Sequence, residues 1–237
     1  MKCAIMQPTY LPWSGYFNLI SQVDVFVFLD DVQYERQSWQ NRNRALVGGK
    51  AHWLTVPAVR LELTQIFNTV KVDDTQGWRK KHIQLLEQTY GKHPHGKEML
   101  DAARGLTDAS VTGLADLNIK LIGEFSRRMD LEPRFVRSSE LGVEGQRSER
   151  LLKICRHFGC DEYLSPVGSA EYLAEDKVFD SASVKLSFQQ FKAAPYAQHK
   201  NQAFVESLSI VDVAANLGWA QARDYVLGRY AAVSKEP

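Results

Sequence analysis

Apolar residues at the start of the chain fall first into a continuous run, then into a helical spacing, then into a second run. Residues 2–7 form a short apolar run that Pro8 ends. Apolar positions between residues 16 and 23 then recur at the i, i+3, i+4, i+7 spacing of one helix face. Residues 24–29 (DVFVFL) are continuous again, which is typical of a strand buried on both faces. The pattern predicts a strand, a helix and a second strand parallel to the first.

The middle of the chain changes from polar to strand-like and then to helical patterns. Residues 30–44 show no helical or alternating period, so we predict an ordered loop. Residues 52–59 and 66–72 are predicted strands. Apolar positions recur every three or four residues over 78–90 and 111–129, and two helices are expected there.

The last third repeats the alternation of strands and helices. A helix is predicted over 148–158, and another begins at Ser209 with Gly218 as its stop signal. Three further segments are strand-like: 133–139, 161–165 and the alternating, half-exposed 184–191.

These elements together predict an α/β fold. We expect an open, mostly parallel, Rossmann-like sheet with helices on both faces, a helical insertion and a C-terminal strand and helix extension. The chain has 237 residues and is 44% hydrophobic, which is enough for a sizeable core. We expect one α/β domain over residues 1–232, with a helical subregion over 75–130 and a disordered tail over 233–237.

Charge and composition exclude several classes of protein. The 29 basic and 28 acidic residues nearly cancel without long runs of one sign, which argues against a nucleic-acid or membrane surface. No apolar run approaches the ~18 residues that a membrane span requires. Three cysteines at irregular spacing fit a reducing compartment, and a cytoplasmic protein is expected. The oligomeric state is left open by the sequence.

The aromatic turn after the first strand is the first candidate site. Ligands of open α/β sheets bind beyond the carboxyl ends of the strands, where residues 8–15 (PTYLPWSG) are expected to lie. Tyr10 and Trp13 could stack on a base or a sugar ring there. Alternatively, both rings plug the sheet edge, and the residues alone favour neither interpretation.

Polar side chains after the second strand are the next candidates. Asp30 and Asp31 point to opposite sides if the strand continues, so only one can reach a given pocket. Such a carboxylate binds a metal, an amine or a ribose hydroxyl, or it caps the next turn. Arg42, flanked by Asn41 and Asn43, has the donor geometry for phosphate, although a solvated surface arginine is equally consistent.

Two polar residues interrupt the predicted helix faces. His82 has apolar neighbours that favour its neutral form, so it is either a general base or a satisfied core histidine. Asn118 needs partners, because burying an amide without hydrogen bonds costs about 2 to 7 kcal/mol. It either braces a loop or contacts a ligand. No base is identified near Cys3, Cys155 or Cys160, which argues against a cysteine nucleophile.

Several long segments resemble the WbqC-like family of bacterial proteins, in order and over almost the whole chain. They are MQPTYLPWSGYF, DVFVFLDDVQYERQSWQNRN, HWLTVP, RKKH, YLSPVG and PYAQ followed by LSIVDVAANLG. One departure is the turn at residues 165–168 (SPVG), where the family tends to have a glycine-rich YLSG sequence. The resemblance implies a role in surface polysaccharide and O-antigen biosynthesis and a glycine transferase activity.

The resemblance also implies an acceptor and a set of site residues. The acceptor would be the amino group of a nucleotide-linked amino sugar. His82 or Asp30 would act as base, Gln7 or Asn43 as hydrogen-bond donor. Arg42 would hold the diphosphate, and Trp13 or Tyr10 would stack on the base. The other expected substrate-binding positions are Gly15, Asp31, Gln33, Asn118, Tyr163, Ser165, Tyr196 and Gln198, and Pro8, Pro12 and Asn41 also match the family pattern.

The acyl donor is expected to arrive already activated, because the sequence shows no ATP site. A thioester on coenzyme A or on an acyl carrier protein fits this requirement. We expect no bound cofactor and no metal ion.

Two other functions remain open. The first strand, turn and helix resemble the HxGH region of nucleotidylyltransferases, but both histidines are absent. Nucleotidyl or phosphoryl transfer would then need Mg²⁺ at Asp30 or Asp31. The third hypothesis is a non-catalytic partner in an assembly complex.

Overall fold

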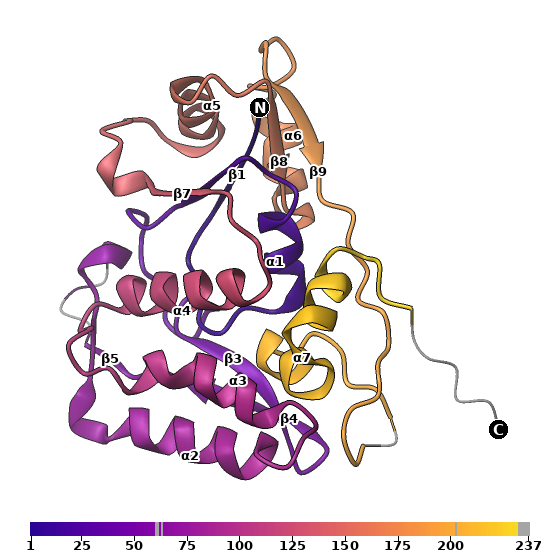
Figure 1. Ribbon diagram of the computed structural model, residues 1–237. Helices are drawn as coiled ribbons and strands as arrows, with labels where there is room; N and C mark the ends of the chain where they lie inside the picture. Colours follow the sequence, from indigo (N-terminus) through magenta and orange to yellow (C-terminus); the bar gives the residue numbers. More distant parts are fainter. Residues whose placement is uncertain (60–61, 63, 202, 232–237) are drawn as a thin grey trace.

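The computed structural model describes residues 1–59, 62, 64–201 and 203–231. Within these residues, five strands form a parallel sheet in the order β7-β2-β1-β8-β9 (Figure 1). In chain order this is third, second, first, fourth and fifth, the order of Rossmann-like sheets. The predicted open parallel α/β sheet is therefore confirmed. The strands are β1 (Lys2–Met6), β2 (Val25–Phe28), β7 (Arg134–Arg137), β8 (Glu162–Ser165) and β9 (Lys185–Phe188).

Both faces of the sheet are covered, which explains why β1 and β2 read as continuous apolar runs. Cys3 and Ile5 of β1 pack into one core with helices α5 (Arg147–His157) and α6 (Ala170–Asp176). Ala4 faces the other core. That core contains residues of α1 (Ser14–Ile20), α4 (Leu114–Arg128) and α7 (Ile210–Val226), and Figure 1 shows α4 and α1 beside the central strands.

The segment between β2 and β7 forms the predicted helical insertion together with two antiparallel strand pairs. Strand β3 (Arg42–Val47) pairs with β4 (Lys50–Thr55), and β5 (Ala58–Val59) pairs with β6 (Lys71–Val72). Helix α2 (Trp78–Tyr90) has the predicted bounds, and α4 carries the predicted inward face. Helix α3 (Gly96–Ala102) was not predicted.

Two sequence predictions in this insertion were wrong. Residues 42–44 begin β3 instead of ending a loop. The strand was not recognised because its inward-facing position 43 holds a buried asparagine, which interrupts the alternation of apolar residues. Residues 67–69 form a 3₁₀ turn, and only Lys71–Val72 pairs as a strand. The Thr69 hydroxyl donates to the Ile66 carbonyl at 2.7 Å, a local bond that competes with strand pairing.

Helix α7 begins where the sequence predicts but does not stop at Gly218. Ser209 Oγ accepts a hydrogen bond from the Val211 amide at 3.4 Å, which confirms the N-cap. Gly218 has φ 77°, so the helix kinks there and resumes to Val226. No helix in the described part of the chain is long and apolar enough to cross a membrane. The tail predicted for residues 233–237 lies outside the described residues.

Candidate functional site

The carboxyl ends of β1 and β8 mark the point where the chain reverses its direction across the sheet. From β1 the strands progress to β2 and β7 on one side, and β8 and β9 then fill the other side. In open α/β sheets such a reversal leaves a crevice in which ligands bind. The structure has two adjoining cavities at this edge.

We name the cavities after one residue of each. Both lie in the size range of small-molecule sites, and they share Met6, Thr9 and Trp39. The Trp13 cavity, about 380 Å³, is lined by Met6, Thr9, Trp13, Tyr16, Trp39, Asn43, Arg44 and Ser207. The Tyr163 cavity, about 310 Å³, is lined by Ile5, Met6, Gln7, Thr9, Leu29, Glu35, Ser38, Trp39, Gln40, Leu151, Tyr163, Pro166, Ser169 and Tyr172.

An exposed pair of tryptophans stands beside the cavities. Trp39 is 49% exposed and Trp53 is 41% exposed, and their ring centroids lie 5.4 Å apart. Trp53 sits opposite Arg44 in the β3–β4 register. Large apolar side chains gathered at the surface often mark an interaction site, and aromatic rings suit stacking on a base or a sugar.

Two arginines accompany the tryptophans and retain unsatisfied donors. The guanidinium of Arg42 lies 4.3 Å from the Trp53 ring centroid, and that of Arg44 lies 5.7 Å from it. Arg44 Nη2 donates to the Ser207 carbonyl at 3.0 Å, and the Nε atoms of both arginines are buried without a partner. Among the described residues, neither forms an ion pair with a carboxylate. Their charge is therefore available to an anionic ligand.

Trp13 lines its cavity and also packs against the protein. Its indole lies over Gly15, where a Cβ would stand 2.1 Å from Trp13 Cζ2. The ring also contacts Phe191 edge-on, with centroids 5.8 Å apart. The space above Gly15 is thus filled by the indole, which accounts for the glycine without any ligand approaching the helix.

Gln7 and Glu35, which line the Tyr163 cavity, have side-chain polar atoms that no described residue engages. Gln40 Nε2 donates to Gln7 Oε1 at 2.9 Å, which fixes the Gln7 amide and leaves its Nε2 without a partner among the described residues. Glu35 is the acidic residue among the described residues that line the two cavities. No hydrogen bond or ion pair in the described part of the chain engages its carboxylate.

Asp30 is fully buried and lies outside both cavities. Its carboxylate accepts from Arg137 Nε at 2.7 Å, from the Ser139 hydroxyl at 2.9 Å and from the Ser139 amide at 3.1 Å. These bonds join the carboxyl ends of β2 and β7. Asp30 therefore belongs to a hydrogen-bond network that holds two strands together. Its role as a base stays a prediction, because its side chain lines neither cavity.

Asp31 takes part in the same network and is also absent from the cavities. Its carboxylate accepts from the Ser138 hydroxyl at 2.6 Å and from Arg150 Nη2 at 2.5 Å. Burial alone would raise the pKa of Asp31, but the hydrogen bonds from Arg150 and Ser138 outweigh it and lower the pKa. Both aspartates are thus engaged by protein donors.

His82 and Tyr10 form a buried pair beneath the turn that follows β1. Tyr10 Oη and His82 Nδ1 are 2.9 Å apart, and the imidazole also hydrogen-bonds the backbone of Thr55. Burial lowers the pKa of His82 to about 4, so the imidazole is neutral at pH 7, as the sequence predicts. Neither residue lines a cavity.

Two asparagines of the predicted site hold loops together. Asn118 Nδ2 donates to the Pro8 carbonyl at 3.0 Å and to the Gln40 carbonyl at 2.8 Å. Asn43 lines the Trp13 cavity, but its amide donates to the Tyr10 carbonyl and accepts from the Arg44 amide. The Asn118 Nδ2 group thus braces two loops, while its Oδ1 is buried without a partner among the described residues, and the predicted contact with a ligand stays a prediction.

Tyr196 and Gln198 contact a buried carboxylate far along the chain from the cavity residues. Tyr196 Oη donates to Asp212 Oδ2 at 2.5 Å, and Gln198 Nε2 donates to the same oxygen at 3.1 Å. Burial raises the pKa of Asp212 despite these bonds. The network fixes the segment before α7 to that helix. Ser165 and Gln33 also lie outside the two cavities, whereas Tyr163 lines one of them.

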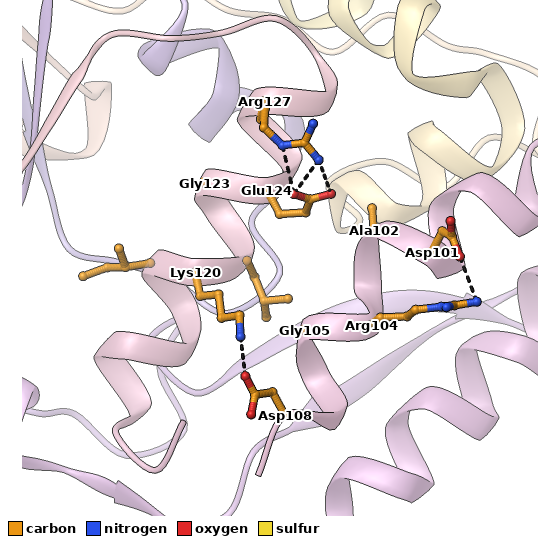
Figure 2. A pocket seen from close by; sticks show the side chains of 11 residues that line it. Asp101, Ala102, Arg104, Gly105, Asp108, Lys120, Gly123, Glu124 and Arg127 are labelled. Atoms are coloured by element: carbon orange, nitrogen blue, oxygen red, sulfur yellow. Dashed lines mark hydrogen bonds and ion pairs between the residues drawn. The ribbon is translucent and has the colours of Figure 1, made fainter. Parts of the chain in front are cut away.

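The cysteines and the ion-paired surface offer no alternative site. Cys3, Cys155 and Cys160 are buried and free, and hydrogen bonds with the other two thiols, together with burial, raise the pKa of Cys3. Among the described residues, no group of three or more His, Cys, Asp or Glu side chains could hold a metal ion. A hollow of about 530 Å³ between α3 and α4 is bordered by the pairs Lys120–Asp108, Arg127–Glu124 and Arg104–Asp101, so its charges are satisfied (Figure 2).

Some of the predicted site residues lie together at the carboxyl edge, and other residues there were not predicted. Gln7, Trp13, Asn43 and Tyr163 do meet at the carboxyl edge of the sheet, and Arg42 stands beside it. Trp39, Trp53, Arg44 and Glu35 were not among the predicted site residues. A tryptophan within the polar segment 30–44 was a usable signal, because an apolar ring in such a context has few buried positions to occupy.

The strand order and the crevice define a Rossmann-like α/β protein with a candidate small-molecule site where the strand order reverses. The model of the WbqC-like protein family matches residues 7–224, and the chain belongs to this family. An uncharacterized protein of Mycobacterium tuberculosis (strain ATCC 25618 / H37Rv) is 32% identical over 229 residues, which cover 95% of this chain and 97% of that protein. No solved structure matches the chain.

Proposed function

We propose that the protein is a transferase that moves an activated acyl group, in the first instance glycyl, onto the amino group of a nucleotide-linked amino sugar in surface polysaccharide (O-antigen) assembly. Membership of the WbqC-like family supports this class of reaction. One observation carries the proposal: two adjoining cavities at the carboxyl edge lie beside exposed tryptophans and arginines that lack carboxylate partners.

The geometry supports a division of the substrate between these features. The base of the nucleotide stacks on Trp39, which borders both cavities and contacts Trp53. Arg42 and Arg44 bind the diphosphate, since planar guanidinium groups donate paired hydrogen bonds to phosphate oxygens. The amino sugar occupies the Tyr163 cavity, where Gln7 and Glu35 offer an amide donor and a carboxylate that no described residue engages.

The residues of the Tyr163 cavity can perform the chemistry of amide formation. The sugar amine attacks the carbonyl carbon of the acyl thioester, the C–N bond forms, the C–S bond breaks, and the thiol leaves. Glu35 takes the proton that the amine loses and returns it to the leaving sulfur. Gln7 Nε2 donates to the carbonyl oxygen as negative charge develops there. Glu35 replaces His82 and Asp30 in this proposal, because those two side chains are engaged inside the protein.

The acyl donor is a thioester on coenzyme A or on an acyl carrier protein. Amide formation from a free carboxylate needs activation, and a thioester brings this activation with the substrate. The protein then has to orient the two reactants and exclude water, which lowers the barrier through proximity.

The test is turnover of aminoacyl thioesters with a panel of nucleotide-linked amino sugars, followed by mass spectrometry. We expect one sugar to gain a glycyl group in the wild type and in His82→Gln. In Glu35→Gln we expect a loss of turnover of about 100-fold or more, the size of a general-base effect. Equal turnover in wild type and Glu35→Gln would contradict the assignment of the base. Tight sugar binding without turnover of any donor would favour the non-catalytic partner.

A further inference from the structure

Another hollow shares no lining residue with the Trp13 and Tyr163 cavities, and the proposed function does not use its basic side chains. It measures about 380 Å³ and lies between the β3–β4 turn, the end of α2 and the segment before α7. We name it the His93 pocket. Its lining residues are Leu46, Val47, Gly48, Gly49, Leu85, Gln88, Thr89, Lys92, His93, His199, Lys200 and Asn201.

The basic groups of the pocket come from two separate segments. Lys92 and His93 follow α2, and His199 and Lys200 precede α7. The two imidazoles face each other with centroids 4.7 Å apart. None of the described residues that line the pocket is acidic. The helix dipole of α2 favours positive side chains directly after its C-terminus, such as Lys92. It does not explain why the segment before α7 contributes His199 and Lys200 to the same pocket.

The walls of the pocket are fixed by hydrogen bonds. The His199 amide donates to Asn216 Oδ1 at 2.8 Å, which attaches this segment to α7. The His93 amide donates to the Tyr90 carbonyl at 2.9 Å. Gly49 lets the hairpin turn approach the third wall, because a Cβ there would stand 3.2 Å from Asn201 Oδ1. The basic side chains therefore extend from positions that are held before any ligand arrives.

One buried polar atom points to a missing partner. His93 Nδ1 is buried and has no hydrogen-bond partner among the described residues. Burial, together with the charges of His199 and Lys200, lowers the pKa of His93 to about 4. An unpaired buried nitrogen is costly until a partner binds, and in the tautomer that carries the proton on Nδ1 this partner is a hydrogen-bond acceptor. A metal ion is disfavoured by the two ammonium groups.

We propose that the His93 pocket binds the phosphate group of a small anionic ligand. The two ammonium groups match the double negative charge of a phosphate monoester, and an imidazole N–H donates to one of its oxygens. Leu46 and Leu85 provide an apolar wall for the remainder of the ligand. The site is separate from the proposed transfer reaction and stands whether or not that proposal holds.

The experiment is an NMR titration of the histidine ring signals with inorganic phosphate at constant ionic strength, with chloride as the matched salt. The six histidines provide internal controls. We expect saturable shifts of the His93 and His199 signals, while those of His52 and His157 stay in place. Assignment uses His93→Gln and His199→Gln.

Two double lysine variants distinguish a specific phosphate site from non-specific attraction by positive charge. The double variant Lys92→Gln/Lys200→Gln should weaken phosphate binding by about tenfold or more, the loss expected for charge-assisted hydrogen bonds. The control Lys80→Gln/Lys81→Gln removes the same charge from exposed positions of α2 and should change affinity by less than about twofold. Absence of saturable shifts in the wild type, or equal weakening in both double variants, would overturn the proposal.

Discussion

Single side chains at the carboxyl edge differ in whether they support the protein or remain available to a ligand. Trp13 covers Gly15 and contacts Phe191, whereas Trp39 is half exposed and borders both cavities. The two tryptophans at this edge therefore have different roles. Trp13 mainly fills space, and Trp39 presents a free face.

Trp39→Leu tests the stacking role at the level of one residue. Removing an exposed ring should leave the melting temperature nearly unchanged. The affinity for a nucleotide-linked amino sugar should fall by roughly 5-fold to 150-fold, since a base–aromatic contact contributes about 1 to 3 kcal/mol. Calorimetry and a thermal melt measure the two quantities. A variant that keeps its affinity would show that the base does not stack on Trp39.

His82 illustrates how burial determines the state of a titratable side chain. An exposed histidine has a pKa of about 6.5, and burial lowers that of His82 to about 4. Between these two values the unfolded chain binds more protons than the folded one. The stabilisation from neutral His82 is therefore complete above pH 6.5 and is lost progressively as the pH falls from 6.5 to 4, by an amount of up to about 3 kcal/mol.

His82→Gln should remove this pH dependence. We expect the free energy of unfolding of the variant to fall less steeply than that of the wild type between pH 7 and pH 4, as followed by urea denaturation. Tyr10→Phe is the matched control, because it removes the hydroxyl partner at 2.9 Å while keeping the imidazole. Its slope should follow the wild type. Identical slopes in wild type and His82→Gln would show that His82 is not the group that titrates.

At the scale of elements, the start of α1 depends on a glycine that admits an indole. Gly15→Ala places a Cβ within 2.1 Å of the Trp13 ring, so the indole must move. We expect the free energy of unfolding to decrease by about 1 to 3 kcal/mol, the usual cost of overpacking. Gly123→Ala in α4 is the control, since nothing lies within 4 Å of its Cβ. That variant should be more stable by up to about 1 kcal/mol. Denaturation curves in which both variants behave alike would contradict the packing argument.

The elements that the sequence predicted well are those whose pattern arises within the element itself. The bounds of α2 and the inward face of α4 follow from the helical period, and β1 and β2 from continuous apolar runs. Strand β3 was missed because Asn43 occupies a buried position that the pattern reserves for apolar residues.

The candidate site was predicted less completely than the fold, because its residues meet through strand register and tertiary contacts that sequence spacing does not show. Trp53 joins Arg44 only through the register of the β3–β4 hairpin. The partners of Asp30, namely Arg137 and Ser139, lie more than a hundred positions away in the chain. Sequence spacing alone indicates that Asp30 follows a strand but cannot show that its lone pairs are already occupied.

At the scale of the whole molecule, the sheet brings its functional groups to one edge. The strand order reverses between β1 and β8, and the insertion between β2 and β7 supplies the hairpin that carries Arg42, Arg44 and Trp53. The proposed transferase therefore combines a crevice of the sheet with a wall contributed by the insertion. Both parts have to be present for one substrate to contact the cavities and the arginines together.

A crystal structure of the protein soaked with a nucleotide-linked amino sugar would locate the substrate. We predict density in the Trp13 and Tyr163 cavities, with the base on Trp39 and the diphosphate within hydrogen-bond distance of Arg42 or Arg44. Density for the bound ligand elsewhere on the surface, or empty cavities at a concentration that saturates binding in solution, would contradict this prediction.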